Sequence, residues 1–223
     1  RFGAVGDGEH DDTAAIQAAI NCCPAGGRVR IPAGDYLIAP LFLKSHITIE
    51  LQKGSRLILT TDRSRFPILP GVTFTQDGEY LLGTWEGNPL DCFASAITGI
   101  DVEDVRIIGP GVVDGQGDKG DWWVNPKIRR GAWRPRLLFL NRCQNVTVHG
   151  VRFMNSPSWQ LHPYNSENLT FAGAEAYTEA LWMAPPFILV EAGKLFRHFA
   201  LKEAIGNLKQ SFDLKIDDLQ VAV

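Results

Sequence analysis

The sequence lacks a strong charge imbalance, a long apolar run and a cysteine framework. It has 22 basic and 25 acidic residues in a chain of 223, for a formal net charge of −3, so its composition favours neither a nucleic acid nor a membrane surface as partner. The longest apolar run, residues 181–190, is interrupted by Pro185-Pro186 and is too short to span a bilayer. The four cysteines have no metal-ligand spacing, so we expect no metal site and no disulfide framework.

A signal peptide and a phosphate-binding loop are also missing. The chain opens directly on Arg1-Phe2-Gly3, so we expect any targeting segment to have been removed or never included. The glycine-rich stretch 2–8 could suggest a loop that cradles phosphate, but no strand precedes it and no Gly-Lys-Ser/Thr follows it. We therefore expect no bound cofactor.

Residues 100–176 contain three copies of one pattern. An acid or amide precedes an apolar residue, a polar residue and a second apolar residue, in Asp104-Val105-Arg106-Ile107, Asn145-Val146-Thr147-Val148 and Asn168-Leu169-Thr170-Phe171. Apolar residues at a spacing of two predict a short strand with one buried face. The second and third copies are 23 residues apart, and the first and second are 41 apart, which fits one period plus an inserted loop. Such a period is typical of a solenoid, in which each unit buries its apolar face against the next.

The repeat predicts an all-β fold, a right-handed single-stranded parallel β-helix in which Asn side chains at the turns form a hydrogen-bonded ladder. Further strands are expected within residues 29–38, 41–51 and 55–59. An antiparallel sandwich with irregular strands is the alternative. A leucine-rich repeat has a similar period, but its Leu-x-x-Leu-x-Leu core is missing. Asn145 and Asn168 also begin glycosylation patterns, yet their place in the repeat favours the turn role.

Residues 11–23 predict a helix that caps the open end of the solenoid. Asp11 and Asp12 stand at its start, where a carboxylate accepts backbone N–H groups and interacts favourably with the helix dipole. Alanine and isoleucine residues give the helix an apolar stripe, and Pro24 with Gly26-Gly27 ends it. We therefore interpret the adjacent aspartates as a cap and not as a catalytic pair.

Two long segments break the strand rhythm, and long loops on a rigid scaffold tend to carry function. The first, residues 63–91, is rich in proline and glycine and contains Tyr80 and Trp85. In the second, residues 118–136, tryptophans are interleaved with basic residues: Trp122, Trp123, Trp133, Lys127, Arg129, Arg130, Arg134 and Arg136. Indole faces stack on sugar rings and guanidinium groups bind carboxylates through two hydrogen bonds, which suits an anionic saccharide. The loop could equally fold its tryptophans onto the solenoid wall and leave its arginines solvated.

Two further interpretations stay open at this point. Single-stranded nucleic acid stacks on the same residue types as those of the 118–136 loop, but the acidic net charge argues against it. His162, in the segment that links two predicted strands, could be a general base or line a groove. A lone histidine beside a proline, here Pro163, is also common as a structural residue.

Motifs that carry a family resemblance lie in order along residues 1–173. They are Phe2-Gly-Ala-Val-Gly-Asp-Gly8, Ile31-Pro-Ala-Gly34, Leu43-Lys-Ser45, Gly109-Pro-Gly111 with Asp114-Gly-Gln-Gly117, Trp122-Trp123, Arg134-Pro135, and Ser156-Pro-Ser-Trp159 with His162-Pro163. Together they resemble the polygalacturonase family of glycoside hydrolases, family 28, within the pectin-lyase-like β-helix proteins. The match is closest to the bacterial exo-acting members of that family.

The resemblance implies a secreted or periplasmic glycosidase that hydrolyses α-1,4 bonds between galacturonic acids in pectin, with inversion. In such chemistry one carboxylic acid protonates the leaving oxygen and a carboxylate on the opposite face activates water. The expected partner is therefore an acidic polysaccharide, galacturonan. Trp122, Trp123, Arg134 and His162 match positions on or near the family's substrate-facing region, so they are the candidate substrate-binding residues.

The chain departs from the family pattern after about residue 173. The catalytic motifs Asn-Thr-Asp, Gly-Asp-Asp, Gly-His-Gly and Arg-Ile-Lys do not occur, and Asp217-Asp218, preceded by Lys215-Ile216, is only an imitation. No catalytic residue is therefore assigned. Residues 1–176 are expected to form the cap and early turns of the β-helix. Residues 177–223 form a divergent tail that could be a helical C-terminal cap or the product of a frameshift or splice. We expect a truncated enzyme with weak or no activity.

Two other functions remain as alternatives. A β-helix that binds acidic polysaccharide without cleaving it would use the 118–136 loop and need no acid–base residues. A calcium-dependent pectate lyase needs clustered carboxylates around a metal and a basic residue to abstract a proton. Asp101, Glu103 and Asp104 do cluster, but at a turn where the ladder explains them.

Overall fold

The computed structural model describes residues 2–177 of the chain. The last strand of this range includes Tyr177, which the sequence placed in the tail. The helical character predicted for the rest of the tail lies outside the described residues. Within residues 2–177, no helix has the length and apolar character that a membrane crossing requires.

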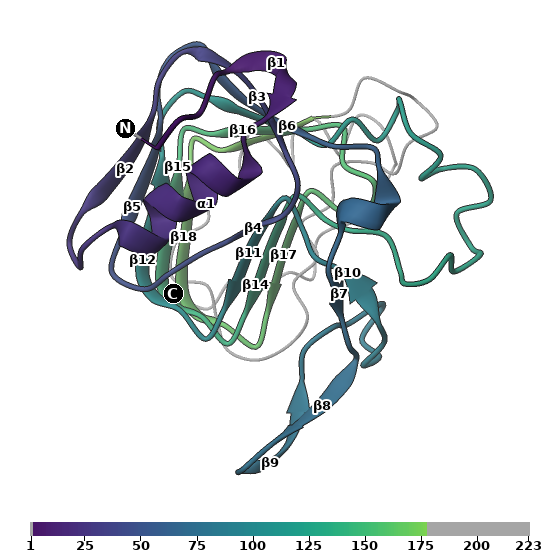
Figure 1. Cartoon of the computed structure of the whole chain (residues 1–223). Coiled ribbons are helices and arrows are strands. Elements are labelled where there is room, and N and C mark those ends of the chain that lie inside the picture. Colours follow the sequence, from purple (N-terminus) through teal and green to yellow (C-terminus); the bar gives the residue numbers. More distant parts are fainter. Residues whose placement is uncertain (1, 178–223) are drawn as a thin grey trace, which may run out of the picture.

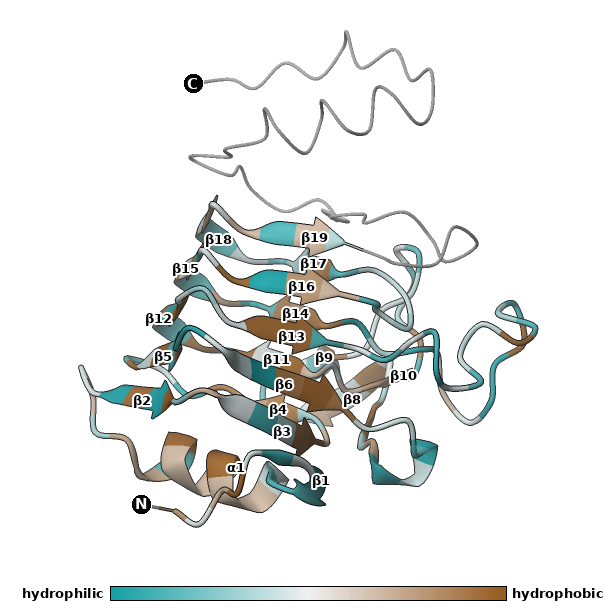
Figure 2. Cartoon of the chain, turned by 90° about the horizontal axis from the view of Figure 1, so that it is seen from above, coloured by the Kyte–Doolittle hydropathy of each residue, from teal (hydrophilic) through white to brown (hydrophobic). Residues whose placement is uncertain are grey.

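Three parallel sheets form the walls of a coil (Figures 1 and 2). Sheet A contains β1 (Asp7–Asp11), β3 (Gly34–Ile38), β6 (Ser55–Leu59), β13 (Val112–Asp114), β16 (Arg152–Met154) and β19 (Glu175–Tyr177). Sheet B contains β2 (Arg28–Ile31), β5 (Thr48–Leu51), β12 (Glu103–Ile108), β15 (Gln144–His149) and β18 (Glu167–Ala172). Sheet C contains β4 (Leu41–Phe42), β11 (Ile97–Ile100), β14 (Leu138–Asn141) and β17 (Leu161–Tyr164).

The order in which the chain visits the sheets defines the fold. It passes from sheet C to sheet B to sheet A and then begins the next turn, as in β11–β12–β13 followed by β14–β15–β16. Successive turns pair in parallel in all three sheets. This arrangement confirms the predicted right-handed single-stranded parallel β-helix, and parallel pairing throughout the coil excludes the antiparallel sandwich.

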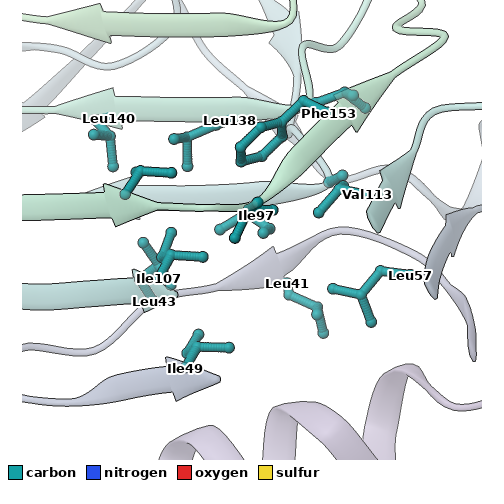
Figure 3. Packing of buried hydrophobic residues seen from close by; sticks show 14 of the residues in the cluster. Leu41, Leu43, Ile49, Leu57, Ile97, Ile107, Val113, Leu138, Leu140 and Phe153 are labelled. Carbon is teal, nitrogen blue, oxygen red and sulfur yellow. The ribbon is translucent and has the colours of Figure 1, made fainter. Parts of the chain in front are cut away.

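The interior of the coil is filled by columns of equivalent apolar residues. Val105 pairs with Val146, and Val146 pairs with Leu169, in neighbouring strands of sheet B. Their side chains are 0%, 1% and 2% exposed. Side chains from sheets A and C meet them from the other walls, as Figure 3 shows for Val113, Ile97 and Leu138 among others. Each turn of the coil therefore buries its apolar face against the next, as the strand repeat predicted, and this burial removes apolar surface from water in every turn.

A second column follows the outside of sheet B. His46, Asp104, Asn145 and Asn168 all have left-handed backbone conformations, with φ values of 62°, 54°, 54° and 51°. Asn168 Nδ2 donates to Asn145 Oδ1 at 2.5 Å, and Asn145 Nδ2 donates to Asp104 Oδ1 at 2.9 Å. The ladder is thus present. Asp104, Asn145 and Asn168 lie inside β12, β15 and β18, each between two paired positions of an unshifted register, whereas His46 lies in the turn before β5 (Thr48–Leu51).

The helix α1 (Thr13–Cys22) covers the first turn of the coil at one end (Figure 2). Ile16 and Ile20 are its buried residues, as its apolar stripe predicted. The predicted capping role is wrong for Asp12, whose carboxylate accepts the N–H groups of Val5 and Gly6 at 2.7 and 2.9 Å. The segment before β1 folds back toward α1 and provides these donors. Asp11 does accept the N–H of Thr13, at 3.1 Å.

The first long segment, residues 63–91, is more regular than predicted. It contains the 3₁₀ helix η1 (Arg63–Arg65) and the strand β7 (Ile68–Leu69), which pairs with β10 (Cys92–Phe93), and then the hairpin β8 (Val72–Thr75) and β9 (Gly78–Leu81). Figure 1 shows this hairpin projecting away from the coil. Its base is attached to sheet C, because Tyr80 donates its hydroxyl hydrogen to Asp101 and its ring lies 3.6 Å from the guanidinium carbon of Arg142.

The ladder generates a prediction for Asn145. Replacing Asn145 with Ala removes its hydrogen bonds and leaves at φ 54° a residue that tolerates the left-handed region less well than Asn does, so this strain adds to the loss and the free energy of unfolding should fall by about 2 kcal/mol. Replacing it with Gly removes the same hydrogen bonds without that strain, so the loss should be about 1 kcal/mol. Urea denaturation of both variants tests this. Equal losses would show that the backbone conformation at this position has no energetic cost.

Candidate functional site

Three tryptophans meet at the corner where the chain crosses from sheet A to sheet C. Trp85, Trp133 and Trp159, called here the tryptophan cluster, lie in the connections between β6 and β11, β13 and β14, and β16 and β17. The rings of Trp85 and Trp133 are stacked, with centroids 4.7 Å apart and planes inclined by 10°. Trp159 lies 4.8 Å from Trp85 on centroids, with its plane tilted by 37°. One loop from each of three successive turns therefore contributes one indole ring.

Backbone hydrogen bonds hold this cluster in place. The Trp133 N–H donates to the Asp91 carbonyl at 2.8 Å, and the Trp133 carbonyl accepts the Phe93 N–H at 2.9 Å. The end of the second long loop is thereby joined to the end of the first. These bonds form a short parallel bridge between Cys92 and Trp133. The position of Trp133 is therefore fixed by parallel backbone pairing, as the strands of the coil are.

Two arginines accompany the tryptophans, and we call Arg134 and Arg136 the arginine pair. The guanidinium carbon of Arg134 lies 4.1 Å from the ring of Trp123 and 5.4 Å from that of Trp85. The guanidinium carbon of Arg136 lies 5.2 Å from Trp85 and 5.3 Å from Trp159. All of these distances are within the range of attraction between a cation and an aromatic face.

The arginine pair carries positive charge that no ion pair offsets among residues 2–177, although the charge of Glu86 acts favourably on Arg134. Burial, together with the charges of Arg136 and Arg63, lowers the pKa of Arg134 to about 10. Arg134 is therefore still protonated at neutral pH, and a bound anion would relieve this electrostatic cost.

Several N–H donors of the site also have no acceptor in the described part of the chain. They are Nε of Arg134, Nε of Arg136 and Nε1 of Trp123, all buried. By contrast, Arg134 Nη1 donates to the Pro157 carbonyl at 2.7 Å, which fixes the side chain on the segment before β17. A buried donor without an acceptor is costly, so the arrangement favours a ligand rich in acceptor oxygens.

The four residues predicted to bind substrate occupy different places. Trp123 and Arg134 are half-buried and lie together beside the tryptophan cluster. His162 is 0% exposed, with its ring 5.7 Å from that of Trp159 on centroids, so it lies under the cluster. Trp122 is 1% exposed and packs away from the cluster, against Phe66 and Phe93. Substrate binding by these four residues stays a prediction.

The two ends of the 118–136 loop lie in different surroundings. Trp122 folds the loop onto the coil and lies 3.8 Å below the guanidinium carbon of Arg63. Asp121 accepts hydrogen bonds from Arg63 and Arg130, which ties the loop to η1. Trp133 and Arg134, at the other end of the loop, belong to the candidate site. Sequence reasoning alone did not separate the part of the loop that packs against η1 from the part beside the tryptophan cluster.

Trp85, Trp159 and Arg136 were not identified as site residues from the sequence. Trp85 lies 48 positions before Trp133 and 74 before Trp159, and no local pattern joins them. The feature of the sequence that could have identified these residues is the solenoid repeat. Since each loop leaves from the same corner, tryptophans in successive loops are expected to meet there.

The acidic residues that suggested a calcium site have other partners. Asp101 binds Arg142 and Tyr80, and Asp104 accepts from Asn145. Glu103 Oε1 lies 3.3 Å from Nε2 of His46. Within the described part of the chain, no group of three or more His, Cys, Asp or Glu residues could hold a metal ion. Asp217-Asp218 lies outside the described residues.

Comparison with known families and proteins agrees with this architecture. The family described as glycosyl hydrolases family 28 matches residues 29–179, and the family described as rhamnogalacturonase A/epimerase, pectate lyase-like, matches residues 1–52. Among solved structures, the exopolygalacturonase of Thermotoga maritima superposes with a TM-score of 0.68 at 27% identity, covering 83% of this chain and 46% of that one.

Two curated proteins illustrate the range of relatives. A "probable polygalacturonase" of Vitis vinifera is 31% identical over 180 residues, which cover 77% of this chain and 35% of that protein. The "plasmin and fibronectin-binding protein A" of Streptococcus pneumoniae is 41% identical over 161 residues, which cover 70% of this chain and 20% of that protein. The chain thus spans about a third of the grapevine protein and a fifth of the streptococcal one.

The loop anchor generates a prediction for Asp121. Partial burial raises the pKa of this carboxyl, but the hydrogen bonds and charges of Arg63 and Arg130 outweigh burial and lower it overall. Replacing Asp121 with Asn removes two exposed ion pairs, so trypsin at neutral pH should cleave the loop at Lys127, Arg129 and Arg130 about 2- to 10-fold faster. Asp77→Asn, in the tip of the β8–β9 hairpin, is the matched control and should leave this rate unchanged.

The same anchor should loosen in acid. A carboxylate whose pKa is lowered by folding contributes its full stability above the pKa of the unfolded chain and loses it as the pH falls through the folded value. Fluorescence of Trp122, which lies against Arg63, should therefore change below about pH 4 in the wild type. A transition that is unaltered in Asp121→Asn would assign the change to another group.

Proposed function

The chain belongs to glycosyl hydrolases family 28, and from this premise we propose that it is a polygalacturonase-like protein acting on α-1,4-galacturonan, the acidic chain of pectin. The observation that carries the proposal is the arginine pair beside the tryptophan cluster, with buried N–H donors that have no acceptor among residues 2–177. Galacturonan presents a carboxylate and a sugar ring at every unit, so it offers both kinds of group that these residues bind.

In the proposed complex, the half-buried side chains make the contacts. Arg134 donates to a sugar carboxylate, and the faces of Trp133 and Trp159 receive the apolar sides of neighbouring sugar rings. Trp123 adds an indole N–H donor next to Arg134. The rigid backbone at the corner holds these groups before the ligand arrives, so little conformational entropy is lost on binding.

The proposed reaction is hydrolysis with inversion, which needs a protonated carboxylic acid on one side of the scissile bond and a carboxylate on the other, roughly 6.5–9.5 Å away. The family motifs that resemblance assigns to these carboxylates are absent from the sequence. We therefore propose that this chain, as given, binds galacturonan and hydrolyses it weakly or not at all. We further propose, as the family resemblance implies, that it acts outside the cytoplasm, secreted or periplasmic, on cell-wall pectin.

A binding measurement tests the site. Wild-type protein should bind oligogalacturonate in calorimetry. Arg134→Gln should weaken binding by roughly 10- to 100-fold because it removes a charge-assisted hydrogen bond, and Trp159→Ala should weaken it by about tenfold because it removes a stacking face. Arg129→Gln, on the exposed part of the same loop, is the control and should change affinity by less than about threefold. No binding by the wild type would refute the proposal.

Turnover is tested separately by the release of reducing ends from polygalacturonate. We expect a rate far below that of an intact family enzyme. A full rate would contradict the argument that the missing carboxylate motifs matter. Activity that is lost with a chelator would point instead to a metal-dependent lyase.

Binding without cleavage is the second candidate function. It is favoured by the 41% identity to a streptococcal protein whose name describes binding to plasmin and fibronectin, together with the absence of the carboxylate motifs. Oligogalacturonate that binds the wild type and is recovered intact after prolonged incubation would support this candidate. Measurable hydrolysis that stops in a variant lacking Arg134 would support the first.

A further inference from the structure

Arg136 is the most deeply buried charged residue of the corner, at 1% exposed. Its backbone is fixed on both sides, since its N–H donates to Ser95 Oγ at 3.2 Å and its carbonyl accepts the Ala96 N–H at 3.2 Å. Its side chain donates to the carbonyl of Thr84. The guanidinium thus has one defined position under the tryptophan cluster.

The surroundings of Arg136 compensate its charge only in part. Aromatic faces surround it, with Trp85, Trp159 and Phe139 between 5.2 and 5.6 Å from its guanidinium carbon. No carboxylate within residues 2–177 forms an ion pair with it, and the like charge of Arg134 lies nearby. A buried charge in such a place stabilises a fold less than an apolar side chain of similar volume would. The hydrogen bond to Thr84 and the aromatic contacts therefore offset only part of the cost of burying this charge.

We propose that Arg136 is a specificity-determining residue, which makes the tryptophan cluster select sugars that carry a free carboxylate over sugars that do not. This inference rests on the proposed function, because it concerns how the same site chooses its ligand. The guanidinium does not touch the ligand. It acts from beneath Trp85 and Trp159, in a region of low dielectric where its field reaches the carboxylate bound above with little screening.

The argument separates the tasks of the two arginines. Arg134 is half-buried and can hydrogen-bond to the carboxylate directly. Arg136 is covered by other side chains, so it contributes to binding in two indirect ways. Its positive charge attracts negative charge to the corner, and its cation–aromatic contacts position the rings of Trp85 and Trp159. A neutral ligand, such as the methyl ester of the same oligosaccharide, would stack on the same rings and gain nothing from this charge.

The test compares oligogalacturonate with its methyl ester, by calorimetry, on the wild type and three variants. Arg136→Met and Arg136→Gln remove the charge, the first with an apolar chain of similar length and the second with a donor retained toward Thr84. Both should weaken binding of the acid by about tenfold and change binding of the ester by less than about twofold. Arg136→Lys keeps the charge and should keep the preference for the acid.

Thermal stability is a further readout. If Arg136 had only a structural role, Arg136→Met should melt at a lower temperature than the wild type. Arg136→Met should melt at the same temperature as the wild type or higher, even though it binds the acid more weakly. Arg142→Met is the matched control, an arginine with an aromatic contact and a carboxylate partner on the hairpin side. It should leave the ratio of acid to ester affinity unchanged.

The possible failures are distinguishable. If the wild type binds neither ligand, the proposed function is refuted together with this inference. If the wild type prefers the acid and the neutral variants prefer it equally, only the role of Arg136 is refuted. Equal weakening of acid and ester would reassign Arg136 to holding the rings alone. If Arg136→Met does not fold, Arg136→Gln decides between these outcomes.

Discussion

Parallel pairing between successive turns is the constraint on which the rest of the structure depends. Because residues pair one to one, equivalent positions lie above one another, and the apolar columns such as Val105, Val146 and Leu169 follow from this. Each turn must also return to its starting point, so extra residues are accommodated only between strands. The long insertions lie between sheet A and sheet C, which leaves the connections from C to B and from B to A short.

The candidate site is a consequence of that restriction. The connections of three successive turns leave from one corner and deliver Trp85, Trp133 and Trp159 to it. A coil with evenly distributed insertions would place such rings on different walls. The corner also receives the arginine pair, whose guanidinium groups form no ion pair with a carboxylate in the described residues. A positively charged, aromatic site can therefore be built from loop residues while the strands below it remain an ordinary apolar coil.

The repetitive parts of this structure could be predicted and the non-repetitive parts could not. Strand spacing identified the columns and the ladder because each is repeated in every turn. The hairpin β8–β9 was missed, since it occurs once and its base depends on Tyr80 reaching Asp101, which is distant in sequence. Asp12 was assigned to the helix cap by local rules, but the returning N-terminal segment offered it two closer donors. In the site, Arg134 was a candidate through the family resemblance, whereas Arg136 was named only as one basic residue of the 118–136 loop, and its burial sets it apart.

The side-chain ladder of sheet B has a polarity. Each amide gives its hydrogen to the turn before it, from Asn168 to Asn145 and from Asn145 to Asp104. An ionised carboxylate only accepts, so the sense of donation must reverse at Asp104. The neighbour on its far side, His46, has Nδ1 3.1 Å from Asp104 Oδ2, and an imidazole nitrogen, unlike a second carboxylate, can donate there. An asparagine column can thus grow from Asp104 in one direction only, and the earlier turn has to supply a different kind of side chain.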